Sequence, residues 1–290
     1  MCRRRAASGV LIMAPERSRK PAGGGVPPEV TARLRVSETL AAAAWGAHDP
    51  KAVPGALCEA CARLLPVSGS SVSISGGRDV RVVWCASDRV AARLAELQYT
   101  VGDGPCQTAL DEGAPVVAAD LTGCDARRWP IFAHEAVALG VRAVFSLPLG
   151  VGGAAIGTLD LYSEHAGGLT QQDMRTALWV RDALTHALLS LPTAGRDLAE
   201  EDTEDEVASW VAASAADHSE VHRAVGMVMV QLDADSGQAL ARLRAHAYAE
   251  GRTVSQVARE VLARRLHFQN EPEGGRRRGT KGLRGREGPV

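Results

Sequence analysis

The sequence predicts an α+β domain with an antiparallel sheet and flanking helices, followed by a separate all-α unit of three helices. Two pairs of short β-rich runs, each joined by a glycine turn, lie between helical stretches in residues 29–191. No strand pattern follows, and residues 207–268 show helical periodicity with capping residues instead. Residues 197–206 hold seven acidic residues and no basic one, so residues 192–206 are expected to form an acidic linker. A chain of 290 residues is long enough for about two domains.

Composition is typical of soluble globular proteins, with 46% hydrophobic residues, 23% charged residues and a net charge of −1. Aromatic residues make up only 4%, so we expect cores of alanine, valine and leucine. No stretch reaches the roughly 18 apolar residues of a membrane span. Six cysteines occur without a convincing secretory signal, which predicts a cytoplasmic protein with reduced thiols. We expect residues 1–28 and the basic tail 269–290 to be disordered, with either Met1 or Met13 as the true start.

The first domain is expected to begin with two helices and to end with a third. Helical spacing predicts helices over residues 29–48 and 53–65, and Pro50 separates them. Glycine turns predict two hairpins, with strands at residues 71–75, 80–84, 143–149 and 155–162. Between the hairpins we expect helices at 88–97, 107–112 and 129–139 and a strand at 115–119. A helix over residues 171–191, capped by Thr170, closes the domain. The sheet is expected to be covered by helices on one face.

Three motifs give this domain a family resemblance: Gly102-Asp-Gly-Pro-Cys106, Pro148-Leu149, and Ile156-Gly-Thr-Leu-Asp-Leu-Tyr162. Their order and spacing resemble the GAF domain, a fold that senses small molecules. The resemblance implies a ligand pocket between the sheet and residues 88–139, and the candidates for ligand or redox sensing are Tyr99, Asp103 and Cys106. Cys106 begins a short helix, whose dipole lowers the pKa of a thiol; a thiol packed under the loop is the alternative. The sensed ligand is unknown, and a dimerisation role without ligand is also open.

In residues 207–268 a valine and methionine stripe at helical spacing is interrupted by Gly226. A glycine inside a helix costs about 1 kcal/mol relative to alanine. Gly226 therefore implies either close packing against a neighbouring helix or close approach of a partner's backbone. Ser236 and Thr253 are expected to cap two further helices, and Gly251 to end the first of them. Residues 236–268 carry six arginines against two carboxylates, a local basic surface in a nearly neutral chain.

Three blocks of this unit carry a second resemblance: Ala224-Val-Gly-Met-Val-Met229, Ala239-Leu-Ala-Arg-Leu-Arg-Ala-His-Ala247 and Val257-Ala-Arg-Glu-Val261. They resemble the ANTAR domain, an RNA-binding antitermination module, and the GAF-then-ANTAR order resembles a family of actinobacterial regulators. Val225 stands where ANTAR domains often carry a lysine, and we expect Arg223 to substitute for it. Because arginine forks match phosphates and base edges, the resemblance implies RNA contacts from Arg223, Ala224, Gly226, Arg242, Arg244, Tyr248 and Arg252.

Helical spacing separates some members of this set. At about 100° per residue, Arg242 and Arg244 diverge by roughly 200°, so only one of them can share a face with Arg223. Ala224 and Gly226 are expected to form a smooth surface for an RNA loop. Tyr248 is expected to stack on a base, with partial burial in the core as the alternative.

Patterns for catalysis and metal binding are weak, so we do not expect an enzyme or a metal site, and no cofactor is identified. Gly102-x-Gly104 lacks the lysine of a P-loop and the third glycine of a dinucleotide fingerprint. Cys58 and Cys61 have metal-ligand spacing but no second pair follows, which favours two buried side chains on a helix. His218 and His222 fit a helix surface better than a metal site.

Together these predictions describe a signal-responsive antitermination regulator, a homodimer whose ANTAR domain binds paired stem-loops in nascent RNA. A coiled-coil-like stripe would place two RNA-binding units side by side; its members are Val207, Val211, Ser214, His218, Val221, Val225 and Val228. The alternative is a GAF ligand-sensing dimer whose C-terminal helices bind protein and not RNA. DNA binding by a helix-turn-helix is a weaker alternative.

Overall fold

The computed structural model describes residues 27–49, 52–75, 81–151, 154–189 and 220–269. The predictions for the two terminal segments, for the acidic linker and for residues 207–219 fall almost entirely outside these ranges.

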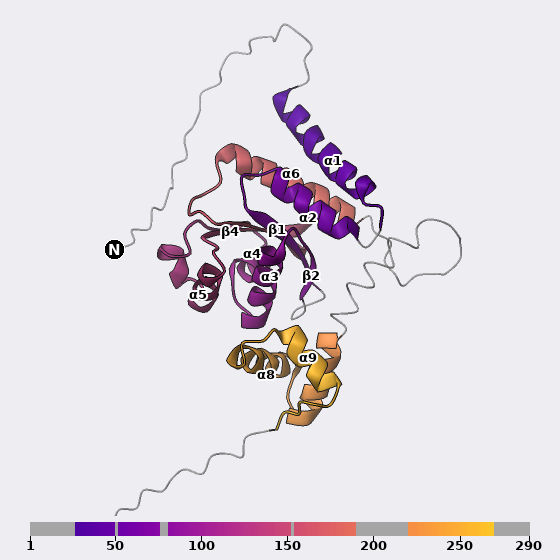
Figure 1. Cartoon of the computed structure of the whole chain (residues 1–290), viewed down its shortest axis with the longest axis vertical. Helices are drawn as coiled ribbons and strands as arrows, with labels where there is room; N and C mark the ends of the chain where they lie inside the picture. Colours follow the sequence, from indigo (N-terminus) through magenta and orange to yellow (C-terminus); the bar gives the residue numbers. More distant parts are fainter. Residues whose placement is uncertain (1–26, 50–51, 76–80, 152–153, 190–219, 270–290) are drawn as a thin grey trace, which may run out of the picture.

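Five antiparallel strands form one sheet in the order β2-β1-β5-β4-β3 (Figure 1). Their bounds are β1 Gly69–Ser75, β2 Arg81–Ala86, β3 Val116–Ala118, β4 Ala143–Val151 and β5 Ala154–Ser163. In the hairpin of β4 and β5, Phe145 lies opposite Leu161 and Leu147 opposite Leu159. β1 pairs with the other edge of β5, so the two predicted hairpins join into one sheet. The predicted strands are confirmed, with ends shifted by a few residues.

Helices cover both faces of this sheet, whereas the sequence predicted cover on one face. α1 (Pro28–Gly46), α2 (Val53–Arg63) and α6 (Gln171–Leu189) lie on one side. On the other side lie α3 (Arg89–Val101), α4 (Pro105–Glu112) and α5 (Pro130–Ala138), the last preceded by a short 3-10 helix η2 (Cys124–Arg127) (Figure 1). The physical reason is visible in β4, where seven consecutive residues are buried, as is typical of strands covered on both faces.

Two apolar clusters fill the space between these layers. Phe145 and Leu147 pack towards α1, α2 and α6, whereas Val144, one residue out of phase, packs with Phe132 of α5. Most buried apolar residues are alanine, valine and leucine, as the composition predicted. Thr170 caps α6 as expected, because its hydroxyl accepts a hydrogen bond from the backbone N–H of Asp173 at 3.1 Å.

The C-terminal unit consists of a helical stretch over residues 220–232, α8 (Ser236–Ala249) and α9 (Val254–Leu262). Thr253 caps α9 as predicted, and Gln256 completes a capping box. At α8 the predicted cap is wrong by one residue: the carboxylate of Asp235 accepts the backbone N–H of Gln238 at 2.8 Å, and Ser236 is the first helical residue. Gly251 follows α8 with φ +63°, a left-handed conformation that suits glycine after a helix.

The predicted coiled-coil stripe is corrected where the structure describes it. Val221, Val225 and Val228 are buried in the core of their own unit, together with Leu243 of α8 and Val257 of α9. Side chains used in this core are not available to a partner helix. Valines at steps of four and three suit a three-helix core as well as a two-helix seam, because both bury one face of a helix. The other members of the stripe lie outside the described residues.

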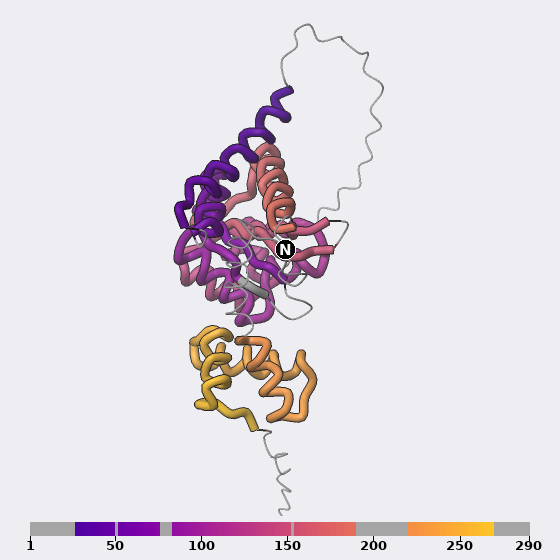
Figure 2. Tube along the Cα trace, turned by 90° about the vertical axis from the view of Figure 1, so that its right-hand side faces the viewer, coloured from indigo at the N-terminus to yellow at the C-terminus, as the bar shows by residue number. Residues whose placement is uncertain are grey.

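The two units contact each other through α3 (Figures 1 and 2). Tyr99 of α3 is 3% exposed and belongs to the core cluster of the C-terminal unit. The backbone N–H of Val254 donates to the hydroxyl of Thr100 at 3.3 Å, and the hydroxyl of Ser255 donates to the carboxylate of Glu96 at 3.3 Å. We call this junction the α3 contact. It is made by Glu96, Tyr99 and Thr100 on one side and by Arg244, Val254 and Ser255 on the other.

Cys58 of α2 and Cys85 of β2 form a disulfide, with their Cα atoms 6.2 Å apart. The prediction of reduced thiols is therefore wrong for this pair and for Cys124, which is also disulfide-bonded, whereas Cys61 and Cys106 retain their thiols. Twenty-seven residues separate the two half-cystines, so no local spacing indicates the pair. Cys58 and Cys61 are both fully buried on α2, as the helix interpretation predicted.

Candidate RNA interface and sensing site

Gly226 lies in a groove of the C-terminal unit with a volume of about 730 Å³. A Cβ atom at Gly226 would meet no other atom within 4 Å among the described residues. Close packing against a neighbouring helix therefore does not explain this glycine in the described part of the chain, and close approach by a partner is the remaining interpretation. The residues that line this Gly226 groove are Arg223, Gly226, Met227, Val230, Gln231, Leu262, Arg264, Leu266 and His267.

One wall of the Gly226 groove comes from the segment after α9. The backbone N–H of Phe268 donates to the side-chain carbonyl of Gln231 at 2.9 Å, and the Phe268 ring meets the His246 ring edge-on at 5.4 Å between centroids. These contacts fold the segment back onto the helix of residues 220–232 and bring Arg264 and His267 beside Arg223. Arg264 and His267 could not be assigned to this site from the sequence, because only the chain reversal brings them to the groove.

Two further residues predicted to contact RNA, Ala224 and Arg242, do not line the Gly226 groove. Ala224 is fully buried, so the prediction that it forms part of a smooth RNA surface is wrong. Ala224 lies on the face of its helix that packs into the core, and this face is not open to solvent. Arg242 is exposed on α8. Its neighbour Arg244 turns towards α3, which confirms that the two side chains diverge.

Arg244 belongs to the α3 contact. Its Nε donates to the backbone carbonyl of Tyr99 at 3.0 Å, and its guanidinium lies 5.4 Å from the centre of the Tyr99 ring, within the range of a cation–π interaction. At Gly102 (φ +74°) an added Cβ would lie 2.9 Å from the Arg244 guanidinium. In this arrangement Arg244 is held by the first domain, so an RNA contact from Arg244 requires the two units to separate.

Arg252 is paired within its own unit. It forms salt bridges to Glu250 at 3.0 Å and to Glu260 at 2.9 Å. Its hydrogen bonds to Glu260 and then to Glu250 raise the pKa of Arg252, and the same Arg252 contact lowers the pKa of Glu260. Tyr248 is 46% exposed and lines, with Arg252, a cleft of about 570 Å³ between the units. Tyr248 is therefore not buried in the core, but it faces α3 and not the Gly226 groove.

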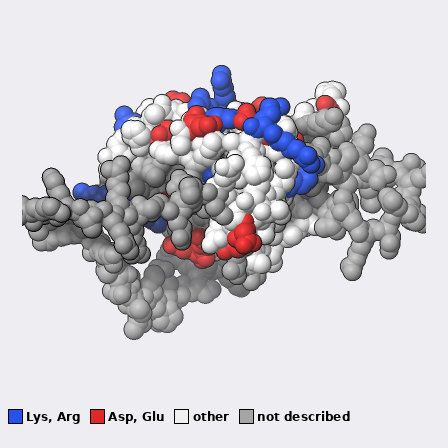
Figure 3. All heavy atoms as spheres, turned by 90° about the horizontal axis from the view of Figure 1, so that it is seen from below, with Lys and Arg blue, Asp and Glu red and all other residues white. Residues whose placement is uncertain are grey.

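Arginine side chains gather at the free end of the C-terminal unit. Figure 3 views this end and shows cationic side chains along one edge, some beside carboxylates, with acidic side chains along the opposite edge. The exposed arginines of the unit among the described residues are Arg223, Arg242, Arg259, Arg264 and Arg265. Arg223 and Arg264 line the Gly226 groove, and Arg259 and Arg265 line a second hollow beside Arg252.

The three predicted sensing residues do not line one pocket. Tyr99 packs into the C-terminal unit, which corrects its expected position beside the sheet, because its place on α3 faces α8. Asp103 is exposed, and its carboxylate accepts the backbone N–H of Gly104 at 2.9 Å. Cys106 is 1% exposed, and its backbone N–H donates to the side chain of Gln98 at 2.9 Å. The packed-thiol alternative therefore describes Cys106 better than an exposed sensor.

A row of buried polar side chains lies where the GAF resemblance implied a pocket. Asp160 of β5 has Ser71 of β1 and Ser146 of β4 as its cross-strand neighbours, and all three are at most 3% exposed. Their positions alternate with residues that face α2 and α6, so they point towards α3 and α4. The amide nitrogen of Gln98 and the hydroxyl of Ser146 have no hydrogen-bond partner among the described residues. This row was not predicted, although polar residues at alternate strand positions, in Ser71-x-Ser73 and Thr158-x-Asp160, indicate one polar face of the sheet.

Metal ligation and membrane insertion find no support in the described ranges. No three histidine, cysteine or acidic side chains gather there in a way that fits a metal ion. Among the same residues, no helix combines the length and the apolar character needed to cross a membrane.

Two domain families match the chain. The GAF domain family matches residues 47–178, and the ANTAR domain family matches residues 211–262. No curated protein matches the chain. The fold, an antiparallel sheet between helical layers followed by a helical unit, agrees with this order of domains.

Solved structures with similar folds are distant in sequence. A putative GAF sensor protein from Burkholderia vietnamiensis is 16% identical with a TM-score of 0.38, over 56% of this chain and 91% of that one. The GAF domain of an Acinetobacter phosphoenolpyruvate-protein phosphotransferase is 8% identical with a TM-score of 0.42, over 58% and 96%. A domain of a putative sensor histidine kinase from Sinorhizobium meliloti 1021 is 17% identical with a TM-score of 0.40, over 47% and 88%.

The fold and the matched families define a signal-sensing regulator with a sensory domain and a C-terminal effector domain. More specifically, the chain is a GAF–ANTAR protein, with its GAF domain followed by an ANTAR domain. The predicted family pair is confirmed, while its actinobacterial type stays a prediction.

Proposed function

We propose that this protein is a signal-responsive RNA-binding antitermination regulator of the cytoplasm, in which the ANTAR domain binds paired stem-loops of nascent RNA. The observation that carries the proposal is the Gly226 groove. It combines an apolar floor with Arg223, Arg264 and His267 at its rim. Unstacked loop bases need an apolar surface, and the adjoining phosphates need cations. Gly226 leaves the space that a close RNA backbone requires.

In this proposal the α3 contact connects sensing to RNA binding. Arg244 is held by Tyr99 of the GAF domain, whereas the groove residues lie on the other side of the ANTAR unit. A signal received by the GAF domain loosens the α3 contact and releases Arg244 to the RNA. The buried polar row around Asp160 is our candidate for the small-molecule site, because it faces α3, the helix that holds the ANTAR unit, and because the buried amide nitrogen of Gln98 on α3 has no partner among the described residues.

We place the homodimer interface on α1 and α6 instead of on the corrected stripe. Trp45 is 89% exposed, and Leu34 of α1 and Leu189 of α6 are more than half exposed. Large apolar side chains exposed together on neighbouring helices are typical of protein interfaces. A dimer made there leaves both ANTAR units available for two stem-loops.

The charge reversals Arg223→Glu and Arg264→Glu together test RNA binding. We expect the double variant to lose at least about 100-fold in affinity for a leader RNA with tandem stem-loops. The slope of log affinity against log salt should fall by about 0.7 for each phosphate that the variant no longer neutralises. Arg63→Glu together with Arg127→Glu, at two exposed arginines of the GAF domain, is the charge-matched control and should bind like the parent protein. Equal binding of the leader and of a scrambled RNA by the parent protein would refute the proposal.

The alternative function, a protein-binding C-terminal module, is favoured by one observation. Val230 in the Gly226 groove is 86% exposed, and apolar side chains of this kind suit protein partners as well as bases. The two functions differ in salt dependence: RNA binding weakens steeply with salt, whereas binding through an apolar groove does not. Saturable binding of a protein partner by a chain that binds no RNA would favour the alternative.

A further inference from the structure

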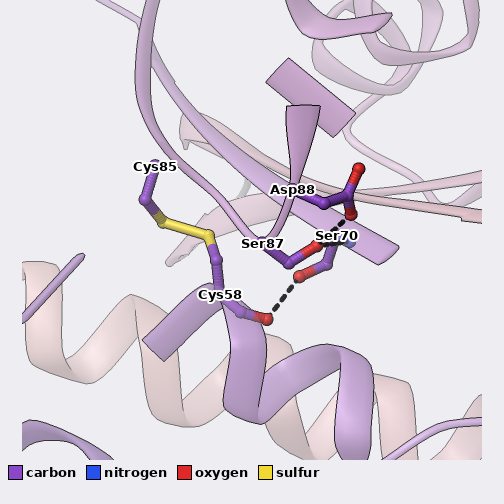
Figure 4. The surroundings of a disulfide bond; sticks show 5 residues. All are labelled: Cys58, Ser70, Cys85, Ser87 and Asp88. Atoms are coloured by element: carbon purple, nitrogen blue, oxygen red, sulfur yellow. Dashed lines mark hydrogen bonds between the residues drawn. A yellow bond between two sulfur atoms is a disulfide. The ribbon is translucent and has the colours of Figure 1, made fainter. Parts of the chain in front are cut away.

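The Cys58–Cys85 disulfide joins α2 to the edge strand β2 (Figure 4). Both half-cystines are buried, Cys58 completely and Cys85 with 7% exposure of the whole residue, so an attacking thiolate approaches the bridge from the Cys85 side, on the edge strand β2, when this edge opens locally. Cys61, one turn further along α2, is a buried thiol, and burial raises its pKa to about 12. Because the thiolate is the nucleophile, Cys61 stays protonated and does not exchange with the bridge.

The fold does not depend on this bridge for a core. Large apolar side chains surround the two half-cystines, among them Leu57, Val72 and Leu161. A domain of this size buries enough apolar surface to fold without covalent links, unlike the small domains for which disulfides are a structural necessity. Opening the bridge therefore leaves a domain that still has an apolar core.

A series of hydrogen bonds leads from the bridge to the start of α3 (Figure 4). The Ser70 hydroxyl donates to the backbone carbonyl of Cys58 at 2.7 Å. The backbone N–H of Ser70 donates to the Ser87 hydroxyl at 2.8 Å, and this hydroxyl donates to the carboxylate of Asp88 at 2.6 Å. Ser87 and Asp88 directly follow β2, the strand that carries Cys85. The position of β2 and the position of Asp88 are thus coupled.

Asp88 is the N-cap of α3. Its carboxylate accepts the backbone N–H groups of Val90 at 2.8 Å and Ala91 at 2.9 Å, and the hydroxyl of Tyr162 at 3.1 Å. The corner has no spare room: a Cβ at Gly69 would lie 2.1 Å from the Asp88 carboxylate. A shift of β2 must therefore move the cap of α3.

The other end of α3 holds the ANTAR unit through Glu96, Tyr99 and Thr100. One helix thus has the disulfide corner at its first turn and the α3 contact at its last two turns. A helix moves as a rigid element, so a change in its cap reaches the far end.

We propose that Cys58–Cys85 is a reversible redox modification site, which a small dithiol reductant opens and whose opening loosens the α3 contact. A thiolate of the reductant attacks the sulfur of Cys85 and forms a mixed disulfide, and the Cys58 thiolate leaves and takes up a proton. The second thiol of the reductant then displaces Cys85, which is also protonated. Two electrons and two protons pass to the protein, and the reductant leaves as a cyclic disulfide.

The proposal rests on the proposed function only for its RNA readout. The full-length protein is prepared oxidised, or reduced with dithiothreitol in the absence of oxygen. Alkylation followed by mass spectrometry counts the thiols, a titration measures affinity for the leader RNA, and hydrogen exchange follows the amides of α3. Reduction should make Cys58 and Cys85 alkylatable, and peptide mapping distinguishes them from Cys124, which is also disulfide-bonded. Reduction should also speed exchange in α3 and raise RNA affinity by at least about fivefold, the lower range of allosteric coupling.

Variants separate this site from other cysteines. Cys85→Ser should behave like the reduced protein and should not respond to dithiothreitol. Two controls, Cys106→Ser at a buried free thiol and Cys124→Ser at a disulfide-bonded cysteine outside this bridge, should respond fully. If Cys85→Ser does not fold, Cys58→Ser serves in its place. A bridge that dithiothreitol leaves closed, exchange rates that do not change on reduction, or a response that persists in Cys85→Ser would each overturn the proposal. Faster exchange on reduction with no RNA binding in either state would leave the modification site standing and refute the proposed function.

Discussion

The ANTAR unit presents arginines in two different ways on its two sides. At the Gly226 groove, Arg223 and Arg264 are exposed around a hollow. At the α3 contact, Arg244 is half-buried and donates to Tyr99, and nearby Arg252 is held by two carboxylates. The residue type is the same, so the difference shows that tertiary contacts, and not the basic composition of the unit, decide which arginines are exposed to solvent in this arrangement.

Among single substitutions, we expect the largest effect on RNA affinity from filling the Gly226 groove. Gly226→Leu places a large side chain where RNA is expected to approach, and we expect affinity for the leader RNA to fall by about 2 kcal/mol, the size of an interface hot spot, or ~30-fold. The folded state should not suffer, because no atom lies within 4 Å of the new Cβ among the described residues. Leucine should even favour the helix by up to about 1 kcal/mol. RNA titration and urea unfolding measure the two effects.

The matched control for this substitution is Ala245→Leu, at an exposed position on α8 outside the groove. It adds an apolar side chain to the same unit and should leave RNA affinity within about twofold. Equal losses in both variants would mean that the groove has no special role. A marked loss of stability in Gly226→Leu would instead restore the packing interpretation of the glycine.

The opposite side of the unit is tested by loosening the α3 contact without touching an arginine. Thr100 is 4% exposed, and its hydroxyl accepts the backbone N–H of Val254. Thr100→Val removes this acceptor, and a buried N–H without a partner costs about 1–3 kcal/mol. We expect the units to separate more often and RNA affinity to rise about fivefold as Arg244 is released.

Thr100→Ser is the control, since it keeps the hydroxyl and should bind RNA like the parent protein. Protease cleavage between the two units provides a second measurement, which should accelerate in Thr100→Val alone. Unchanged affinity together with faster cleavage would show that the α3 contact exists but does not limit access to RNA.

The two sides of the unit also show which features of the structure can be predicted from the sequence. Local signals sufficed for the elements: hairpin turns, the Thr253 cap and the order of the two domains were predicted, because each depends on residues close together in the chain. It was harder to predict which residues of a helix are buried. Ala224 and Val225 carry no mark that separates a core face from an RNA face, and the structure places both in the core.

Contacts between distant segments could not be predicted from periodicity at all. Tyr99 and Arg244 are 145 residues apart, and each is unremarkable in its own helix. Cys58 and Cys85 likewise meet only because α2 covers the edge of the sheet. The run of seven buried residues in β4 did carry a readable signal for a sheet covered on both faces, and the prediction of cover on one face overlooked it.

The smallest effect is expected where an arginine is engaged only at the surface. Glu260→Gln removes the strongest partner of Arg252. Because exposed ion pairs contribute little, the urea midpoint at neutral pH should fall only slightly and RNA affinity should rise by about twofold or less. The Arg252 contact lowers the pKa of Glu260 in the folded state, so its stabilisation is present above the unfolded pKa of about 4.3 and is lost as pH falls through the lower folded value. Urea midpoints of parent and variant should therefore differ at pH 7 and converge as the pH falls through the lowered folded pKa of Glu260. A gain in RNA affinity as large as that of Thr100→Val would mean that Arg252, and not Arg244, is the arginine that the regulator withholds from RNA.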